Sequence, residues 1–289
     1  MNTHTRLLPK EAGEATGGDG KRAPISRPAV LFGPMNQPVS DLRGLRIWLV
    51  GASSGIGAEL ARQALQAGAR VALSARRADV LQEVAAAHKN AFIAPLDVLC
   101  HDAWRDQHAR IVEVFGGIDL LVFCAARYRP ERSWEVQEDE AEHTIRTNLA
   151  SVYSALGAAL PDMLARGSGG IALVASVAGY VGLPGATVYG PGKAALINLA
   201  EILYSDLRPK GLNVYLVNPG FVKTELTDKN DFAMPAIQTP QQAATAIWRG
   251  IAEGRFEIHF PLRFTAWLKI LRLLPFRLRF MLFQRFLLN

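Results

Sequence analysis

Cysteine is scarce in this sequence, which holds only Cys100 and Cys124 among its 289 residues. Two cysteines without a CxxC spacing build neither a disulfide framework nor a zinc site, and no metal is expected. The scarcity excludes a small disulfide-rich secreted protein and indicates a reducing, cytoplasmic setting.

Long apolar runs are lacking as well. No segment reaches the roughly 20 uninterrupted apolar residues that a membrane-spanning helix needs, because Arg and Lys interrupt the hydrophobic end of the chain. Residues 1–30 contain no apolar stretch typical of a secretory signal, since Leu7 and Leu8 are followed by charges and glycines. The sequence predicts neither export nor a membrane span, while attachment to the inner face of a membrane stays open.

Positive charge is confined to one end of the chain. The net charge is +6, and residues 255–289 hold seven Arg and Lys against one acidic residue, so the remainder of the chain is neutral. A nucleic-acid-binding protein needs its basic surface on the fold itself. The distribution of charge therefore argues against nucleic acid as a partner.

The composition divides the chain into three parts. Residues 1–40 mix Gly, Pro, Ser and charges without a hydrophobic period, which is typical of a flexible leader. Residues 41–262 form one predicted domain, because no internal repeat or linker interrupts them. Residues 263–289 form a basic, amphipathic helical tail.

Short apolar segments alternate with helix-length segments through the predicted domain. We expect strands at residues 46–50, 70–74, 91–95, 120–124, 171–175 and 214–217. Near-continuous apolar strands predict a parallel sheet with helices on both faces, and right-handed crossovers make this a doubly wound α/β fold. In such a sheet, ligands bind at the carboxyl ends of the strands.

A glycine-rich loop follows the first predicted strand. Residues 51–57 read Gly51, Ala52, Ser53, Ser54, Gly55, Ile56 and Gly57, and a helical segment comes next. Glycines permit a tight turn and a close approach of the backbone to a ligand. The free N–H groups and dipole of the following helix favour a pyrophosphate there, with a plain strand-to-helix turn as the alternative.

This loop, with its GxxxGxG spacing, resembles the cofactor loop of the classical short-chain dehydrogenase/reductase family. The resemblance implies a Rossmann fold and a nicotinamide cofactor. Val50 stands where the family often has threonine. Asp97 resembles the family's aspartate beside the adenine ring, with capping of the next helix as the alternative. Val98 and Ala125 are further cofactor contacts that the resemblance implies.

Two arginines stand where a dinucleotide-binding fold meets the adenosine ribose. An acidic residue about 20 residues after the loop would favour a free 2′-hydroxyl, but this sequence has Arg76 and Arg77. Guanidinium groups suit a 2′-phosphate by charge and bidentate geometry. NADP(H) is therefore predicted over NAD(H), and two solvated arginines at a helix start are the alternative.

Tyr189 and Lys193 stand four residues apart, which places both side chains on one face of a helix. A neighbouring ammonium is expected to lower the pKa of the phenol, so that Tyr189 can exchange a proton as a general acid. Pro191 and Gly192 between them are poor helix formers, though proline is tolerated in a first turn.

The resemblance extends to residues around this pair. Ser176 ends an apolar strand 13 residues before Tyr189 and matches the family's catalytic serine, which implies a hydrogen bond to the substrate carbonyl. Asn148 resembles the family's helix asparagine, which implies a proton-relay water. The resemblance also implies that Lys193 binds the nicotinamide ribose.

Residues 218–224 look like the family's Pro-Gly segment beside the nicotinamide, which implies contacts from Pro219, Gly220, Val222 and Thr224. Residues 123–126, Phe-Cys-Ala-Ala, depart from the family's Asn-Asn-Ala-Gly. Cys124 in this segment is interpreted as a small core residue rather than a nucleophile.

The tail has the pattern of an amphipathic helix. Over residues 264–274, Thr265, Lys269 and Arg272 share one narrow sector and apolar residues fill the rest, until Pro275 interrupts the pattern. This composition suits peripheral contact of residues 264–289 with anionic lipid. A helix pair packed on the sheet or across a dimer interface is the alternative.

Taken together, these residues predict reductive hydride transfer from NADPH to a carbonyl carbon of a small molecule. The hydrophobic tail and an expected substrate lid at residues 221–240 favour a lipophilic substrate, and we expect a homo-oligomer. The alternatives are a non-catalytic nicotinamide-nucleotide sensor and a membrane-surface scaffold.

Overall fold

The computed structural model describes residues 33–229 and 234–287, with side chains as far as residue 282. Residues 1–32 of the predicted leader and residues 230–233 of the predicted lid lie outside the described residues.

The centre of the molecule is a seven-stranded sheet in the order β3-β2-β1-β4-β5-β6-β7, in which every neighbouring pair is parallel. Its strands are β1 (Arg46–Val50), β2 (Arg70–Ser74), β3 (Ala91–Ile93), β4 (Leu120–Phe123), β5 (Gly169–Val174), β6 (Leu212–Pro219) and β7 (Glu257–Phe260). The predicted doubly wound sheet and its six expected strands are confirmed. We missed β7, whose half-exposed Glu257 and His259 hide the apolar signal of Ile258 and Phe260.

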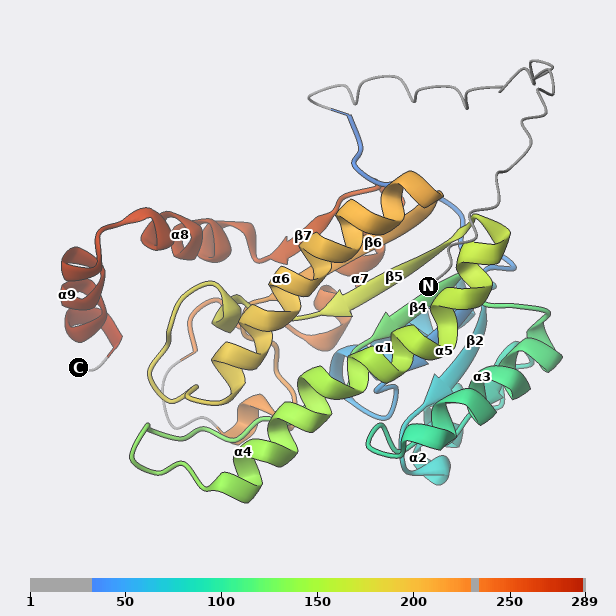
Figure 1. Ribbon diagram of the computed structural model, residues 1–289, viewed down its shortest axis with the longest axis horizontal. Helices are drawn as coiled ribbons and strands as arrows, with labels where there is room; N and C mark the ends of the chain where they lie inside the picture. The colour runs from blue at the N-terminus through green and yellow to red at the C-terminus, as the bar shows by residue number, and fades with distance from the viewer. Residues whose placement is uncertain (1–32, 230–233, 288–289) are drawn as a thin grey trace, which may run out of the picture. The chain divides into compact units, whose positions relative to one another are not determined.

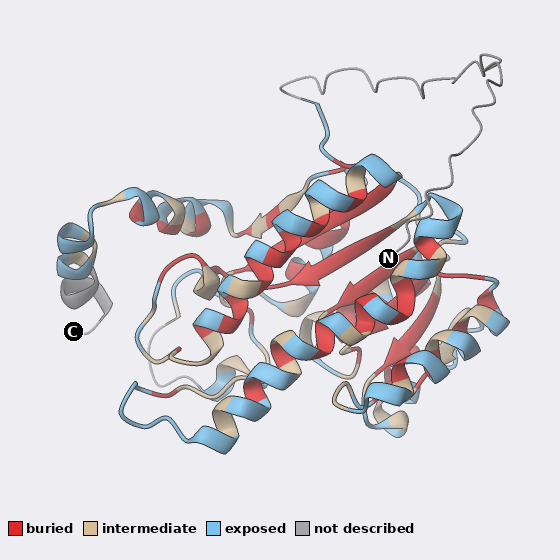
Figure 2. Cartoon of the chain, in the orientation of Figure 1, coloured by how far each residue is buried: buried red, intermediate tan, exposed pale blue. Residues whose placement is uncertain are grey.

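Helices cover both faces of the sheet (Figure 1). The core on one face includes residues of α1 (Gly55–Gln66), α2 (Ala78–Ala85) and α7 (Pro240–Ala252). The core on the other face includes residues of α3 (His101–Phe115), α5 (Ser151–Arg166) and α6 (Tyr189–Leu207). Figure 2 shows the buried strands between helices that expose only their outer sides. This double burial explains why the strands are almost continuously apolar.

The chain reverses its direction of travel across the sheet at β1. It runs outward from β1 through β2 to β3, and then returns to place β4 on the other side of β1. The carboxyl ends of β1 and β4 therefore open a crevice between the diverging connections, which is where such folds bind ligands.

The segment after β4 reaches α5 through α4 (Glu138–Ile145) and a π-helical turn, Arg146–Ala150. Short 3₁₀ turns lie at Val177–Gly179, Arg208–Lys210 and Thr227–Lys229. The π-helical turn carries the predicted site residue Asn148, which is 1% exposed.

The end of the predicted leader belongs to the fold. The Asn36 side chain is 1% exposed, and its amide donates to the Val214 carbonyl at 2.7 Å and accepts from the Val214 N–H at 3.0 Å. At the next residue the roles are reversed: the Gln37 N–H donates to the amide oxygen of Asn213, and the Asn213 amide nitrogen donates to the Gln37 carbonyl. The boundary at residue 40 is thus too late, because a polar side chain that pairs with a strand's backbone leaves no hydrophobic period in the sequence.

The tail forms two helices, α8 (Leu262–Leu273) and α9 (Phe276–Leu287), separated at Pro275 as predicted. Thr265, Leu268 and Leu271 of α8 are buried against the body. No helix within the described ranges is long and apolar enough to cross a membrane.

Candidate active site

A cavity of about 840 Å³ lies at the carboxyl ends of β1, β4, β5 and β6. Its walls hold every predicted cofactor-binding residue and three of the four predicted catalytic residues: Gly51, Ser53, Ser54, Gly55, Ile56, Gly57, Arg76, Arg77, Asp97, Val98, Ala125, Ser176, Tyr189, Lys193, Pro219, Gly220, Val222 and Thr224. Asn148 is not among the lining residues. The topology therefore brings together residues that lie up to 173 positions apart in the sequence.

The glycine loop leaves no room for side chains where the backbone turns. A Cβ on Gly51, whose φ is +89°, would lie 2.5 Å from the Ala125 nitrogen, and a Cβ on Gly57 would lie 2.0 Å from the Gly51 oxygen. The helix α1 that follows has Ser54 as its N-cap without a side-chain capping bond. Its first N–H groups therefore remain available to an anion.

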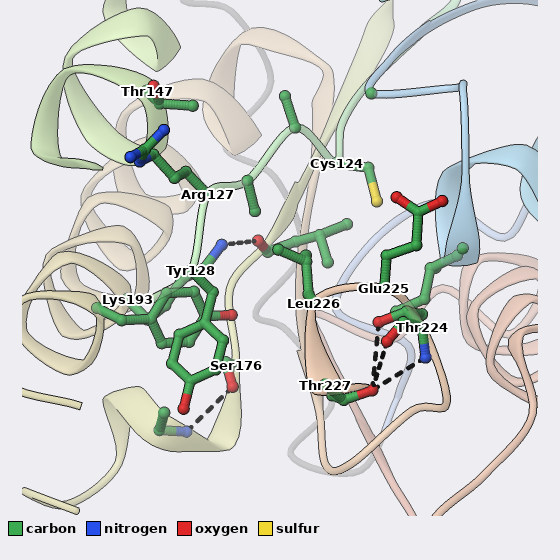
Figure 3. Close-up of a pocket in the computed structure, with 18 of the residues that line it drawn as sticks. Cys124, Arg127, Tyr128, Thr147, Ser176, Lys193, Thr224, Glu225, Leu226 and Thr227 are labelled. Carbon is green, nitrogen blue, oxygen red and sulfur yellow. Dashed lines mark hydrogen bonds between the residues drawn. The ribbon is translucent and has the colours of Figure 1, made fainter. Parts of the chain in front are cut away.

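Thr224, in the segment after β6, lies close to the glycine loop. A Cβ on Gly55 would be only 2.8 Å from the methyl carbon of Thr224. The Thr224 N–H donates to the Thr227 hydroxyl at 2.9 Å, and that hydroxyl donates in turn to the Val222 carbonyl at 2.7 Å. Figure 3 shows Thr224 and Thr227 across the cavity from Ser176 and Lys193. The turn thus closes one side of the cavity over the glycine loop.

Arg76 and Arg77 are exposed at the rim of the cavity, just after β2. Asp97 accepts a hydrogen bond from the Leu99 N–H at 3.0 Å. It does not cap α3, whose N-cap is Cys100. The capping alternative for Asp97 is therefore wrong, and its carboxylate is part of a turn that lines the cavity.

Tyr189 is the first residue of α6, and Lys193 lies one turn later with its ammonium 5.4 Å from the centre of the tyrosine ring. The helix continues through Pro191 and Gly192, because the N–H that proline lacks would have no helical partner in a first turn. Ser176, at the end of β5, has its hydroxyl 3.2 Å from the Ala178 N–H, from which it accepts. In this bond the Ser176 hydroxyl is the acceptor, so its own proton remains for a second partner such as the neighbouring Tyr189 hydroxyl.

The pKa of Tyr189 is shifted in the direction opposite to the prediction. Burial raises the pKa of Tyr189 above its usual value, although the hydroxyl of Ser176 opposes this. Burial also lowers the pKa of Lys193 to about 8, and its ammonium donates to the Val174 carbonyl at 2.9 Å. Lys193 therefore does not lower the pKa of Tyr189 in this geometry, because it points to a backbone oxygen and desolvation dominates.

Asn148 acts on the backbone instead of facing the cavity. Its amide oxygen accepts from the Arg127 N–H at 2.7 Å, and its amide nitrogen donates to the Arg127 carbonyl at 2.8 Å. Both bonds hold the segment after β4, which forms part of the cavity wall. The amide of Asn148 is thus engaged in positioning that wall.

Cys124 lies beside the glycine loop at the end of β4. Burial raises the pKa of its thiol to about 11, so the thiol stays protonated near neutral pH. A protonated thiol is a poor nucleophile, which agrees with its interpretation as a small packing residue.

Several lining residues were missed in the sequence. The Tyr128 ring packs edge-on to Tyr189 with centroids 4.9 Å apart, and Arg127 pairs with Glu140. Both follow directly after β4, and their place at the carboxyl end of a central strand was the signal that could have identified them. The described parts of the predicted lid meet through a bridge between Val222 and Gln238, and Phe221 and Leu226 line the cavity.

Comparison with known proteins agrees with this geometry. The family model for short chain dehydrogenases matches residues 46–234. An uncharacterized oxidoreductase of Myxococcus xanthus is 34% identical over 231 residues, which cover 78% of this chain and 91% of that protein. A 3-oxoacyl-(acyl-carrier-protein) reductase of Staphylococcus aureus is 34% identical over 185 residues, 62% of this chain and 75% of the relative.

Solved structures show the same fold. A short-chain dehydrogenase from Streptomyces avermitilis superposes with a TM-score of 0.71 at 26% identity and covers 83% of this chain and 97% of its own. The structure of a putative betaketoacyl-ACP reductase gives a TM-score of 0.65 at 27% identity and covers 76% and 97%. The chain belongs to the short-chain dehydrogenase/reductase family, and it is an oxidoreductase of carbonyl and alcohol groups.

Proposed function

We propose that this protein is an NADP(H)-dependent carbonyl reductase in which Tyr189 donates the proton. The observation that carries the proposal is the convergence of Ser176, Tyr189 and Lys193 on the cavity that also contains the glycine loop. The site fits a dinucleotide, because the glycine loop lines the cavity and the start of α1, which has no side-chain cap, offers N–H groups to a pyrophosphate.

The bound nicotinamide supplies the hydride. The residues of the chain hold the cofactor in place along the cavity: the glycine loop at the pyrophosphate, Asp97 and Val98 at the adenine, and Ala125 with residues 219–224 at the nicotinamide end. Lys193 bonds to the nicotinamide ribose in this proposal. Its ammonium is already desolvated and directed by the Val174 carbonyl, so little further ordering is needed.

The proton comes from Tyr189. A phenol whose pKa is raised by burial remains protonated at neutral pH, which is the state that a reductive general acid requires. Ser176 donates its hydroxyl proton to the carbonyl oxygen when substrate is bound and stabilises the charge that develops there. Asn148 positions the opposite wall through Arg127. A relay of protons at Asn148 stays a prediction.

The preference for NADP(H) rests on Arg76 and Arg77 at the adenosine end of the cavity. Neither arginine takes part in a salt bridge among the described residues, so both guanidinium groups are available to a 2′-phosphate.

A lipophilic substrate is favoured by the far end of the cavity. Leu183, Pro184, Phe221 and Leu226 line it, and the Phe221 ring lies 5.7 Å from that of Phe264 in the tail. The relationship to a 3-oxoacyl-(acyl-carrier-protein) reductase is consistent with a ketone on an aliphatic chain. A homo-oligomer and a cytoplasmic place stay predictions.

The deciding experiment compares wild type with Tyr189→Phe. We expect kcat for ketone reduction to fall by about 10²–10⁴-fold, because the general acid is lost, while NADPH binding measured by fluorescence is unchanged. Tyr153→Phe, on the exposed side of α5, is the matched control and should keep full turnover. Equal turnover in wild type and Tyr189→Phe would remove Tyr189 from the reaction, and wild-type binding without turnover of any ketone would favour a nucleotide sensor.

A further inference from the structure

The helix α8 turns two polar side chains, Thr265 and Lys269, toward the body. Thr265 is 0% exposed, and its hydroxyl lies 2.7 Å from Nδ1 of His259 on β7. The Lys269 ammonium donates to Oε2 of Glu257 at 2.5 Å. Leu268 and Leu271, each 2% exposed, pack into the core between these contacts. Hydrogen bonds, an ion pair and packing together fix which side of α8 faces the body.

Glu257 is a strong anchor for this arrangement because it joins three elements. Its Oε1 accepts from the Tyr180 hydroxyl at 2.5 Å and from the Asn218 amide at 2.9 Å. The neighbouring ammonium of Lys269 and these hydrogen bonds hold the pKa of the Glu257 carboxyl below its usual value. The carboxylate therefore remains ionised and keeps Lys269 on the inner side of the helix.

Many of the exposed side chains of α8 and α9 are apolar. Of the seventeen large hydrophobic side chains that are exposed in the described chain, eight lie within residues 262–281. On α8 these are Leu262, Trp267, Ile270 and Leu273, and Leu273 is 84% exposed. On α9 they are Phe276, Leu278, Phe280 and Met281. We call these eight residues the tail surface.

The segment that carries the tail surface is also basic. Residues 262–282 contain Arg263, Lys269, Arg272, Arg277 and Arg279 and no acidic residue. Among the described salt bridges only Lys269 belongs to this segment, and the Arg279 guanidinium stacks 4.5 Å from the centre of the Phe276 ring. Arginines beside exposed aromatic and aliphatic side chains are the composition of an interfacial helix.

We propose that the tail surface docks on an anionic lipid bilayer, with α8 and α9 lying in its interface. Each helix has 12 residues, about 18 Å at 1.5 Å per residue, which is too short to cross a bilayer of about 30 Å. A two-fold contact between two copies would instead place the arginines of one tail against those of the other. Negatively charged headgroups compensate this charge while the acyl region takes up the apolar side chains.

Docking would also place the substrate cavity next to the bilayer. The start of α8 lies against residues 218–224, the segment proposed to contact the nicotinamide. A Cβ on Gly220 would lie 3.2 Å from the Phe264 ring and 3.2 Å from Pro261. Gly220 and Phe221 line the cavity. This consequence rests on the proposed function, whereas docking itself does not.

The experiment is flotation of the full chain with vesicles of phosphatidylcholine alone or of phosphatidylcholine mixed with phosphatidylglycerol. We expect binding to the mixed vesicles only, weakened by high salt because screening reduces the attraction of arginines to the headgroups. The double variant Ile270→Glu, Leu273→Glu should bind at least about tenfold more weakly, since both side chains leave the apolar region. Ile202→Glu, which adds a charge at an exposed position of α6, is the matched control and should bind as wild type does.

Reduction of a short, water-soluble ketone in solution separates this proposal from the proposed function, because the double variant keeps the entire cavity and should turn over normally. Binding to mixed vesicles that is equal in wild type and the double variant would overturn the proposal. A wild type that fails to float, and whose oligomer dissociates in the double variant by light scattering, would overturn it in favour of a second copy. Circular dichroism of each variant establishes that it is folded.

Discussion

At the scale of single residues, burial decides the chemistry of this site more than the spacing of its side chains. The spacing of Tyr189 and Lys193 predicts their shared helix face, but it does not predict that Lys193 donates to a backbone carbonyl. Desolvation acts on both groups and favours their neutral forms, which raises the pKa of the phenol and lowers that of the ammonium.

This burial of Lys193 predicts a pH dependence of stability. The folded protein loses the proton near pH 8, whereas the ordinary pKa of lysine in an unfolded chain is 10.5. Between these values the unfolded state binds more protons, so the free energy of unfolding rises with pH. Relative to Lys193→Met, we expect wild type to gain about 2 kcal/mol between pH 8 and pH 10.

Urea unfolding of both proteins across this range measures the effect. The raised pKa of Tyr189 acts in the opposite direction only above the ordinary tyrosine value of 10, outside the range. A difference between the two proteins that does not change with pH would show that Lys193 titrates normally.

Arg76 and Arg77 are predicted to determine the preference for NADPH over NADH. Replacing both with alanine should weaken NADPH binding by about tenfold or more and leave NADH binding unchanged, because each charge-assisted bond to a 2′-phosphate contributes about 1.5–3 kcal/mol. Titration of cofactor fluorescence gives both dissociation constants. Arg62→Ala, on the exposed side of α1, controls for loss of general positive charge. Equal weakening toward both cofactors would contradict a 2′-phosphate contact.

At the scale of elements, the glycine loop and α1 act as one unit. Gly57→Ala places a methyl group 2.0 Å from the Gly51 oxygen, so the loop must shift. We expect a loss of about 1–3 kcal/mol in stability and of most nucleotide affinity. Gly157→Ala on α5, where nothing lies within 4 Å of the added Cβ, should raise stability by about 0.5–1 kcal/mol. Thermal unfolding with and without NADPH tests both variants.

The two helices of the tail differ in what they contribute to the fold. Deleting residues 262–289 exposes the pockets of Leu268 and Leu271, each worth about 1.5–3 kcal/mol when buried. Deleting only residues 276–289 removes α9, whose described side chains are mostly exposed, and should change the Tm by a few degrees at most. Calorimetry of the two truncated chains distinguishes them, and equal Tm values would mean that α8 is not packed as described.

At the scale of the whole molecule, the site exists because one parallel sheet gathers loops from distant parts of the sequence. The switch point beside β1 brings the glycine loop, Tyr128 and the turn around Thr224 around a single cavity. The sheet also carries the tail, because β7 provides both Glu257 and His259 for α8. The contacts of α8 with β7 therefore connect the tail to the same sheet that carries the cavity.

Much of this organisation follows from the sequence alone. Apolar segments at regular intervals determine a doubly wound sheet, since only burial on both faces favours such strands. The motifs at residues 51–57, 176 and 189–193 predict the proposed cofactor loop and the proposed reacting side chains, because these need particular residue types at short, local spacings.

Only the tertiary structure decided the rest, and the reason is that each case depends on contacts between distant residues. Asn36 joins the fold by pairing with the backbone of Val214, which no local pattern records. The orientation of α8 is set by contacts of Thr265 and Lys269 with His259 and Glu257 on β7, so two residues of the sector that looks polar in the sequence face the body beside Leu268 and Leu271. Hydrophobic periodicity identifies the apolar and polar sides of a helix in the sequence. The elements against which the helix packs determine which of its residues are buried.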